Sequence, residues 1–311
     1  MNTQINLAIV FPGQGSQSVG MMNELLATES ELSSIFDSAS EVLGYDLLDI
    51  INFGPEKKLN QTKITQPALV ASAYATWLMC KDILQSSPTV FAGHSLGEYT
   101  ALVCAGVIEF QDAIALVAER GKCMQKAVPL DTGAMAAILG LENEQIAQIC
   151  TVAAESEIVS TANFNSPGQV VIAGDKSAVE RAIVMARDIG AKRALLLPVS
   201  VPSHCWLMKE AADEFAITLN KTHFNDAETP VIQNVNAEVK TKSNEIKKAL
   251  LEQLYMPVHW VDSINRMQSM GVNKIIECGP GKVLSGLIKR IDRSIQTHSV
   301  QNKISLMKAL N

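Results

Sequence analysis

A serine set between glycines is the first group in this chain that could do chemistry. Residues 93–99 read GHSLGEY, a G-x-S-x-G pattern with Ser95 at its centre. A β-rich run precedes it and a helix-like stretch follows it, which is the setting of a nucleophile elbow. Gly93 and Gly97 suit a turn in which a Cβ would clash with neighbouring backbone. The pattern predicts Ser95 as an exposed nucleophile, although ordinary strand-to-helix turns also produce such short patterns.

Two backbone N–H groups could stabilise an oxyanion beside Ser95. Leu96 lies at the N-terminus of the predicted helix, where free N–H groups and the helix dipole favour negative charge. Gln14 lies in the loop 12–17, PGQGSQ, which follows an apolar strand and matches neither phosphate-binding glycine pattern. A separate loop commonly supplies the second oxyanion donor, so we expect the N–H of Gln14 to do so.

An arginine interrupts the apolar stripe of the helix predicted over 111–127. Arg120 lies four residues after Leu116 and four before Met124, so it faces the same side as both. A guanidinium that faces inward needs a partner, and its planar fork fits a carboxylate. The position predicts a site for a substrate carboxylate. The alternatives are an arginine that reaches the helix edge or one that pairs with an internal acid.

His204 is the histidine best placed to act as a base for Ser95. It lies in the segment 201–206, VPSHCW, where a proline and a serine signal a helix start. We expect it in the first helical turn, where the dipole keeps the imidazole neutral. The other four histidines are expected to be structural: His94, His223, His259 and His298. His94 is next to Ser95 and is expected to point to the opposite side. Cys205 is a weaker candidate nucleophile, because adjacent side chains do not face each other on a helix.

Composition narrows the class of protein. The chain has 311 residues, of which 47% are hydrophobic and 19% charged, as in globular proteins with a sizeable core. A net charge of -6 argues against a general nucleic-acid binder. The longest apolar stretch, 68–80, is shorter than the roughly 20 residues of a membrane span, and the N-terminus lacks a signal-peptide pattern. We expect a cytoplasmic, monomeric protein with no membrane partner.

Neither the cysteines nor the histidines have the spacing of a metal site. The six cysteines are scattered without a C-x-x-C pair, and no H-E-x-x-H pattern occurs. The sequence therefore predicts reduced thiols and no metal.

Alternating elements must position these residues. The segment 128–198 follows the order βαββαβ, a ferredoxin-like unit. Its strands are predicted at 133–139, 158–164, 169–173 and 193–199, and its helices at 142–153 and 177–189. We expect it to be a small domain inserted in a larger α/β domain formed by 1–127 and 199–311, with the ligand cleft between the two.

The larger domain is expected to contain a parallel sheet covered by helices on both faces. A long buried helix is predicted over 67–84, and the later segments read as strand 230–235, helices 243–255 and 258–270, strand 274–277, a further helix and strand 297–300. The turn 279–282, GPGK, could bind an anion at a helix N-terminus, but a plain connection is favoured.

Several motifs together resemble a known family. They are FPGQGSQ at 11–17, GHSLGEY at 93–99, Arg120, ANFNSPGQ at 162–169, VPSHC at 201–205, QLYMPVHW at 253–260 and ECGPGKVLSGL at 277–287. This set is similar to that of the bacterial malonyl-CoA:acyl-carrier-protein transacylases of type II fatty-acid synthesis, over essentially the whole chain. The resemblance implies an α/β-hydrolase-like large domain with a ferredoxin-like insert.

The resemblance also implies roles. Ser95 would be the nucleophile and His204 the general base, and the N–H groups of Gln14 and Leu96 would form the oxyanion hole. Arg120 would bind the malonyl carboxylate. Three further residues complete the implied site: Gln253, whose carbonyl would orient the histidine, and the substrate-binding residues Met124 and Asn165.

The implied reaction transfers malonyl from malonyl-CoA to the phosphopantetheine thiol of holo acyl carrier protein through a malonyl-serine, without a metal or redox cofactor. Because the carrier is acidic, the pairs Lys192 with Arg193 and Lys289 with Arg290 are candidate docking charges, although such pairs are usually solvated surface. Three rivals stay open. They are a trans-acting acyltransferase of a polyketide synthase, a serine esterase or thioesterase, which Arg120 disfavours, and an inactive binding module.

Overall fold

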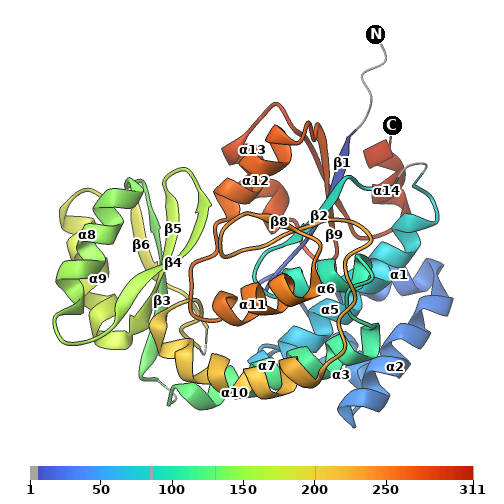
Figure 1. Cartoon of the computed structure of the whole chain (residues 1–311), viewed down its shortest axis with the longest axis horizontal. Helices are drawn as coiled ribbons and strands as arrows, with labels where there is room; N and C mark the ends of the chain where they lie inside the picture. The colour runs from blue at the N-terminus through green and yellow to red at the C-terminus, as the bar shows by residue number, and fades with distance from the viewer. Residues whose placement is uncertain (1–5, 85–86, 130, 200, 311) are drawn as a thin grey trace.

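A mixed, mostly parallel sheet runs through the larger part of the molecule. The computed structural model describes residues 6–84, 87–129, 131–199 and 201–310 (Figure 1). The strands of this sheet are β1 (Leu7–Phe11), β2 (Val90–Gly93), β7 (Val231–Ile232), β8 (Val239–Lys240), β9 (Lys274–Cys278) and β10 (Gln296–Val300). Their order is β10-β9-β1-β2-β7-β8, and only the β7–β8 pair is antiparallel.

The α/β class is confirmed, but the expectation of a wholly parallel sheet is wrong at its edge. The strand predicted over 230–235 is only two residues long, Val231–Ile232, and the chain then turns back into β8. Gln233 and Asn234 follow Ile232, so the run lacks the continuous apolar residues that would extend a parallel strand buried on both faces.

Alternating side chains of β1 divide the core of this sheet in two. Ile9 and Phe11 pack in the apolar cluster of the N-terminal helices, and Ala8 and Val10 pack on the opposite face with the helices 260–269 and 283–291. This is the two-sided burial expected of a central parallel strand. The sheet is therefore fixed from both faces, and the loops at the carboxyl ends of β1 and β2 rest on a rigid base.

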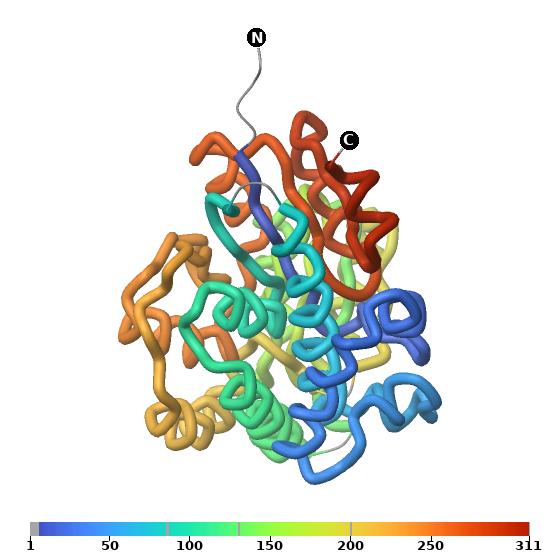
Figure 2. The backbone as a smooth tube through the Cα atoms, turned by 90° about the vertical axis from the view of Figure 1, so that its right-hand side faces the viewer, coloured from blue at the N-terminus to red at the C-terminus, as the bar shows by residue number. Residues whose placement is uncertain are grey.

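Helices cover both faces of the sheet. The N-terminal group is α1 (Asn23–Thr28), α2 (Ser33–Leu43), α3 (Leu47–Phe53), α4 (Glu56–Leu59), α5 (Thr62–Lys81), α6 (Gly97–Cys104) and α7 (Phe110–Ala127). Three C-terminal helices bury side chains in the same apolar cluster: α10 (Lys209–Lys221), α11 (Ser243–Gln253) and α14 (Lys303–Leu310). The opposite face is covered by α12 (Trp260–Ser269) and α13 (Val283–Ile291). Figure 2 shows α1 to α5, blue to cyan, grouped with the green α7. No helix of the described residues is long and apolar enough to cross a membrane.

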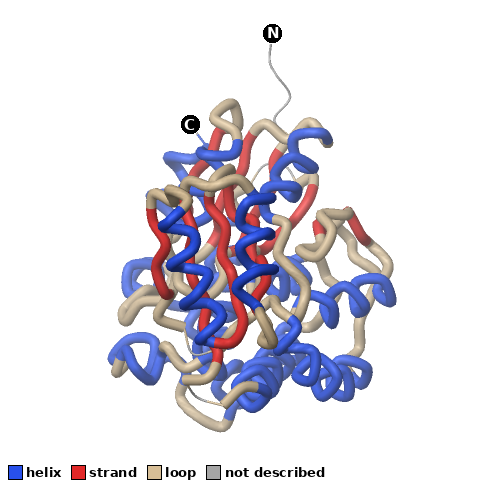
Figure 3. The backbone as a smooth tube through the Cα atoms, turned by 90° about the vertical axis from the view of Figure 1, so that its left-hand side faces the viewer, coloured by secondary structure: helices blue, strands red, loops and turns tan. Residues whose placement is uncertain are grey.

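A second, antiparallel sheet matches the predicted βαββαβ order. It contains β3 (Gly133–Leu139), β4 (Val159–Ser166), β5 (Gln169–Asp175) and β6 (Arg193–Leu196), arranged β4-β5-β3-β6. The helices α8 (Asn143–Ala154) and α9 (Lys176–Asp188) cover one face of it, as Figure 3 shows. β6 ends earlier than the predicted 193–199, because Leu197 to Val199 turn toward the cleft described below.

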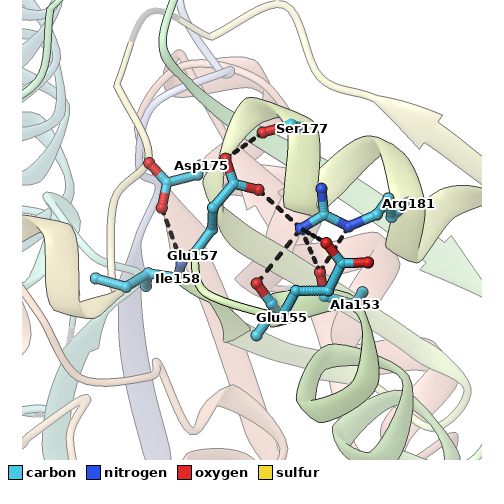
Figure 4. A network of polar contacts seen from close by, with 8 residues as sticks. Ala153, Glu155, Glu157, Ile158, Asp175, Ser177 and Arg181 are labelled. Carbon is cyan, nitrogen blue, oxygen red and sulfur yellow. Dashed lines mark hydrogen bonds and ion pairs between the residues drawn. The ribbon is translucent and has the colours of Figure 1, made fainter.

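One arginine ties the two helices of this second sheet together. From α9, the guanidinium of Arg181 donates to the carbonyl of Ala153 at 2.7 and 2.9 Å and to Glu157 Oε2 at 2.7 Å (Figure 4). Its charge therefore lies at the C-terminus of α8, where the free carbonyls and the helix dipole favour a cation. Asp175 supports the same corner by accepting a hydrogen bond from the Ile158 N–H at 2.8 Å.

Helices α5 and α7 cross closely, next to Arg120. The helix predicted from residue 67 begins earlier, at Thr62, because Pro67 is accommodated inside α5. A proline removes one backbone donor and usually marks the first turn, which is why the sequence pattern placed the start too late. At the crossing, a Cβ added to Gly121 would lie 2.8 Å from Lys63 Cα and 3.0 Å from its nitrogen.

We expect Gly121→Ala to lower the free energy of unfolding by about 1 to 3 kcal/mol, because α5 must move to admit the methyl group. Chemical denaturation measures this change. The matched control is Gly286→Ala on α13, where a Cβ meets nothing within 4 Å. Alanine should stabilise that helix by up to about 1 kcal/mol. Equal effects of the two substitutions would contradict the close crossing.

Candidate active site

The turn between β2 and α6 has the geometry of a nucleophile elbow. Ser95 has a positive φ of 51°, a region that non-glycine residues seldom adopt. A Cβ on Gly93 would lie 1.9 Å from the carbonyl carbon of Gly97, and one on Gly97 would lie 2.1 Å from Phe11 O. The steric role predicted for both glycines is confirmed.

A side chain that the sequence reasoning missed holds this turn. Asn234 follows β7, the neighbour of β2, and its Oδ1 accepts from the Ser95 N–H at 2.6 Å. Its Nδ2 donates to Gly93 O at 2.7 Å, so one amide bridges both sides of the serine. The only signal in the sequence was a polar residue beyond a strand end, on the side of the sheet where ligands bind.

His204 meets the serine across 109 residues of chain. Its Nε2 lies 2.7 Å from Ser95 Oγ, and its Nδ1 lies 2.6 Å from the carbonyl oxygen of Gln253. A carbonyl only accepts, so Nδ1 carries the proton and Nε2 offers a lone pair to the serine hydroxyl. The contact expected between Ser95 and His204 is present, and so is the Gln253 carbonyl.

The reason given for a neutral His204 is wrong. The residue precedes the short 3-10 turn Trp206–Met208 and α10, and has a φ of 63°, so it does not lie in a first helical turn. Burial instead, together with the nearby Arg120 charge, lowers the pKa of His204 to about 3. Only 2% of the residue is exposed. Its imidazole is therefore neutral at physiological pH.

Arg120 faces inward, as its place on the apolar stripe predicted. It is fully buried, and burial lowers the pKa of its guanidinium. Nη1 donates to Gln66 Oε1 at 2.9 Å and Nη2 to Gln253 Oε1 at 3.0 Å, while the guanidinium carbon lies 5.5 Å from the centre of the Tyr99 ring. Among the described residues, no carboxylate lies within ion-pair distance of it.

A cleft of about 600 Å³ opens over the serine. Ser95, His204, Gln14 and Asn165 line it, together with apolar residues such as Val171 of β5, Leu197 just after β6 and Leu284 of α13. In the described part of the chain, the backbone N–H groups of Gln14 and Leu96 donate to no other group, so they are available to an oxyanion.

Arg120 and Met124 lie behind the wall of this cleft and do not line it. The Gln66 side chain, which bonds Arg120, also lies 3.6 Å from Met124 Sδ and 3.5 Å from Gln14 Oε1. These two long contacts are weaker than the bond to Arg120. Gln66 therefore stands between the cleft and the guanidinium.

His94 corrects another expectation, because it lines the cleft with Ser95. Its Nε2 lies 2.8 Å from Asn165 Oδ1, and its ring contacts Trp260 edge-on. The left-handed backbone at Ser95 breaks the strict alternation that would have sent neighbouring side chains to opposite sides.

The comparisons with known proteins agree with this geometry. The model of the acyl transferase domain family matches residues 8–308. A malonyl CoA-acyl carrier protein transacylase of Haemophilus influenzae is 53% identical over 299 residues, covering 96% of this chain and 96% of the relative. The chain belongs to the malonyl CoA-acyl carrier protein transacylase family.

Two solved structures of similar proteins extend the match to the fold of this transacylase. An acyl carrier protein S-malonyltransferase from Vibrio cholerae has a TM-score of 0.95 and 55% identity, covering 98% of this chain and all of the other. A second match comes from the structure of a type II PKS acyl-carrier protein in complex with its malonyl-transacylase. It has a TM-score of 0.96 and 50% identity, covering 98% of this chain and 99% of the matched chain. The predicted family and fold class are confirmed.

Cys205 does not offer a second nucleophile in this transacylase. Its sulfur is buried and donates to Pro202 O at 3.1 Å, and burial raises the pKa of the thiol to about 12. A protonated thiol is a poor nucleophile. All six cysteines are free, and the residues that the structure describes contain no group of three side chains that could hold a metal.

The GPGK turn of the transacylase is a plain connection, because a carboxylate of the chain already occupies it. Glu277 accepts from the N–H groups of Leu284 and Ser285 at 2.9 and 2.7 Å. It therefore fills the N-terminus of α13 where an anion would bind. The alternative anion site is not supported.

The lowered pKa of His204 has a consequence for stability. The unfolded histidine takes up a proton near pH 6.5, but the folded one resists protonation down to about pH 3. The free energy of unfolding should therefore fall as the pH falls through this window. Compared with His204→Asn, the wild type should lose about 1.5 kcal/mol more between pH 6.5 and 5. Urea denaturation at both pH values measures the difference.

Asparagine is the replacement because it tolerates a left-handed backbone. Comparing the two proteins also removes the contribution of Glu98 to the pH dependence. Burial raises the pKa of Glu98 to about 7, so its effect on stability has the opposite sign between pH 4.5 and 7. Equal losses in the two proteins would show that His204 is not excluded from protonation by the fold.

Proposed function

We propose that this transacylase moves the malonyl group of malonyl-CoA to the phosphopantetheine thiol of holo acyl carrier protein, as its relatives' names state, and so supplies fatty-acid synthesis. The observation that carries the proposal is the contact of 2.7 Å between Ser95 Oγ and a neutral His204, in a cleft with a buried arginine behind it. An acyl-transfer site needs a nucleophile paired with a base, and an acyl group with a free carboxylate needs a cation to bind it.

In the first half-reaction, His204 Nε2 accepts the Ser95 proton while Oγ attacks the thioester carbonyl. The tetrahedral oxyanion receives hydrogen bonds from the N–H groups of Gln14 and Leu96. When the intermediate collapses, the C–S bond breaks, coenzyme A takes the proton from His204, and a malonyl ester remains on Ser95. The hydrogen bond from Nδ1 to Gln253 O keeps the ring in the required tautomer throughout.

The second half-reaction reverses these steps with a different thiol. His204 takes the proton of the phosphopantetheine thiol, the sulfur attacks the malonyl-serine carbonyl, and Ser95 Oγ leaves with the proton returned from His204. Each acyl group is thus held covalently between two thioesters, which gives ping-pong kinetics. We propose that no metal or redox cofactor takes part.

Arg120 is proposed to bind the free carboxylate of the malonyl group. Its two terminal nitrogens each donate to one glutamine, so each retains a second N–H for an anion. Gln66 must shift for the carboxylate to reach them, which its two weak contacts to Gln14 and Met124 permit. We place Met124 beside the acyl group and Asn165 at the cleft edge.

The rival functions differ at this arginine. An esterase or thioesterase that handles simple acyl chains has no use for a buried cation behind its serine, which lowers the pKa of the catalytic base. A polyketide carrier stays open as an alternative acceptor, because one relative is a complex with such a carrier.

We propose two domains around the cleft, 1–127 with 199–311 and 128–198, because the second sheet has an apolar core of its own. Residues from both line the cleft. The monomeric state, the cytoplasmic location and the absence of nucleic-acid or membrane partners stay predictions.

The function is tested by incubating the protein with malonyl-CoA and measuring its intact mass. The wild type should gain one malonyl group, which holo acyl carrier protein then removes. Ser95→Ala should gain none, because the only proposed nucleophile is absent. A malonyl ester on the mutant would place the nucleophile elsewhere.

Selectivity tests the role of Arg120. Replacing it with alanine removes an interaction that malonyl-CoA makes and acetyl-CoA cannot. Breaking a buried, charge-assisted pair costs about 3 to 5 kcal/mol, so kcat/KM for malonyl-CoA should fall by at least about 10²-fold. Acetyl transfer should hold or improve. Equal losses for both thioesters would mean that Arg120 supports the fold and does not bind the carboxylate.

The docking of the carrier is proposed at two exposed basic pairs. Lys289 and Arg290 lie in the last turn of α13, whose first turns line the cleft. Lys192 precedes β6 and Arg193 begins it, and this strand leads to the cleft. Among the described residues, Arg290 donates only to the neutral Gln169, at 2.6 Å. Both pairs therefore present positive charge near the cleft to an acidic carrier.

Reversing one pair, with Lys289→Glu and Arg290→Glu together, should raise KM for the carrier by about 3- to 10-fold at low salt. KM for malonyl-CoA should not follow. The control is Lys303→Glu with Lys308→Glu on α14, which changes the net charge equally but does not line the cleft. A similar rise in both double mutants would reduce the effect to net charge alone.

A further inference from the structure

A carboxyl group lies buried directly behind the nucleophile elbow. Glu98, in the first turn of α6, has no exposed surface. Its Oε2 accepts from the backbone N–H of Asn234 at 3.0 Å and from Nε2 of Gln253 at 2.9 Å. Its Oε1 is buried and makes no hydrogen bond with any described residue. Such a group is costly to bury, so its retention at this point calls for an account.

Gln253 connects this carboxyl group to every reactive part of the site. Its backbone oxygen accepts from His204 Nδ1, and its side-chain Oε1 accepts from Arg120 Nη2 at 3.0 Å. Its Nε2 donates to Ser95 O at 2.9 Å as well as to Glu98. One residue therefore touches the base, the backbone of the nucleophile and the buried cation.

Two charged groups decide which way the Gln253 amide faces. Arg120 only donates hydrogen bonds, so it requires the amide oxygen. Glu98 Oε2 already faces the N–H of Asn234 and accepts whether the carboxyl is ionised or carries a proton on the unpaired Oε1, so Glu98 requires the amide nitrogen. Without Glu98, a flipped amide would lose only the bond to Ser95 O on the elbow side, and the orientation would be far less constrained.

We propose that Glu98 is a positioning residue that acts through Gln253. By fixing Gln253, it holds two groups in place relative to Ser95: the backbone carbonyl that His204 bonds, and the Arg120 guanidinium. It touches neither substrate nor reacting atoms. It also anchors the N–H of Asn234, whose side chain bridges the elbow. The inference rests on the proposed malonyl transfer.

Electrostatics is consistent with a link between the two buried charges. Burial raises the pKa of Glu98 to about 7 and lowers the pKa of Arg120, and each of the two groups partly offsets the shift of the other. The carboxyl and the guanidinium thus favour each other's ionisation across the Gln253 amide. Glu98 partly offsets the cation before a malonyl carboxylate arrives.

The test compares Glu98→Ala with Glu98→Gln. Alanine removes the acceptor of two buried donors, so kcat should fall by about 10- to 100-fold for malonyl-CoA and acetyl-CoA alike. The malonyl-to-acetyl ratio of kcat/KM should fall by a further factor of about 3 to 10, because Gln253 no longer fixes Arg120. Glutamine keeps an acceptor at Oε2 and should recover most of both losses.

A double-mutant cycle separates action through Gln253 from a general effect on the fold. Gln253→Met removes the side-chain amide but keeps the backbone carbonyl. Adding Glu98→Ala to it should lower kcat by no more than about threefold, because the path is already broken. Losses that multiply would overturn the proposal, and so would a Glu98→Ala enzyme with an unchanged malonyl-to-acetyl ratio.

Two controls keep the test decisive. Thr100→Val, at an equally buried position two residues along α6, should leave the ratio unchanged, because Thr100 has no bond to Gln253. If Glu98→Ala does not fold, Glu98→Asp replaces it; its shorter carboxylate cannot reach both donors, so the ratio should fall. A wild-type ratio in Glu98→Asp would overturn the inference. Failure of the wild type to form malonyl-serine would instead overturn the proposed function.

Discussion

The left-handed backbone of Ser95 is the constraint on which the rest of the site depends. It directs the hydroxyl into the cleft and leaves the Leu96 N–H without an acceptor among the residues that the structure describes. It also brings β2, α6 and β1 so close that Gly93 and Gly97 cannot carry a side chain. Such a conformation costs about 1 to 3 kcal/mol and persists only where its surroundings determine it. Here the Asn234 amide does so, because it bonds the chain on both sides of the serine.

Around this elbow, buried polar side chains form a network of hydrogen bonds. His204, Arg120 and Glu98 are all buried, and each has its partners supplied in whole or in part by Gln253. In a low-dielectric interior, interactions among such groups are stronger than in water, and a missing partner costs more. The same burial that makes the network expensive keeps His204 neutral and ready to accept a proton.

The cleft combines apolar walls with a buried cation behind them. Its walls come from loops and from elements beside both sheets, with residues 13–17 on one side and Leu197, Pro198, Val199 and Val201 on another. The apolar side chains among them suit a thioester arm. Under the proposed function the buried cation adds selectivity, since an acyl group without a carboxylate would leave Arg120 with glutamine partners alone. Selectivity of this kind comes as much from the cost of leaving the buried cation unpaired as from its attraction to a carboxylate.

The sequence by itself determined what depends on local pattern. Glycine spacing identified the elbow, the 3.6-residue period put Arg120 on the buried face of α7, and alternating elements predicted the βαββαβ order of the second sheet. The tertiary structure alone decided the rest. It placed Asn234 and Glu98 behind Ser95, turned His94 into the cleft and kept His204 neutral by burial. These contacts join residues more than 100 positions apart, and no local period encodes such pairs.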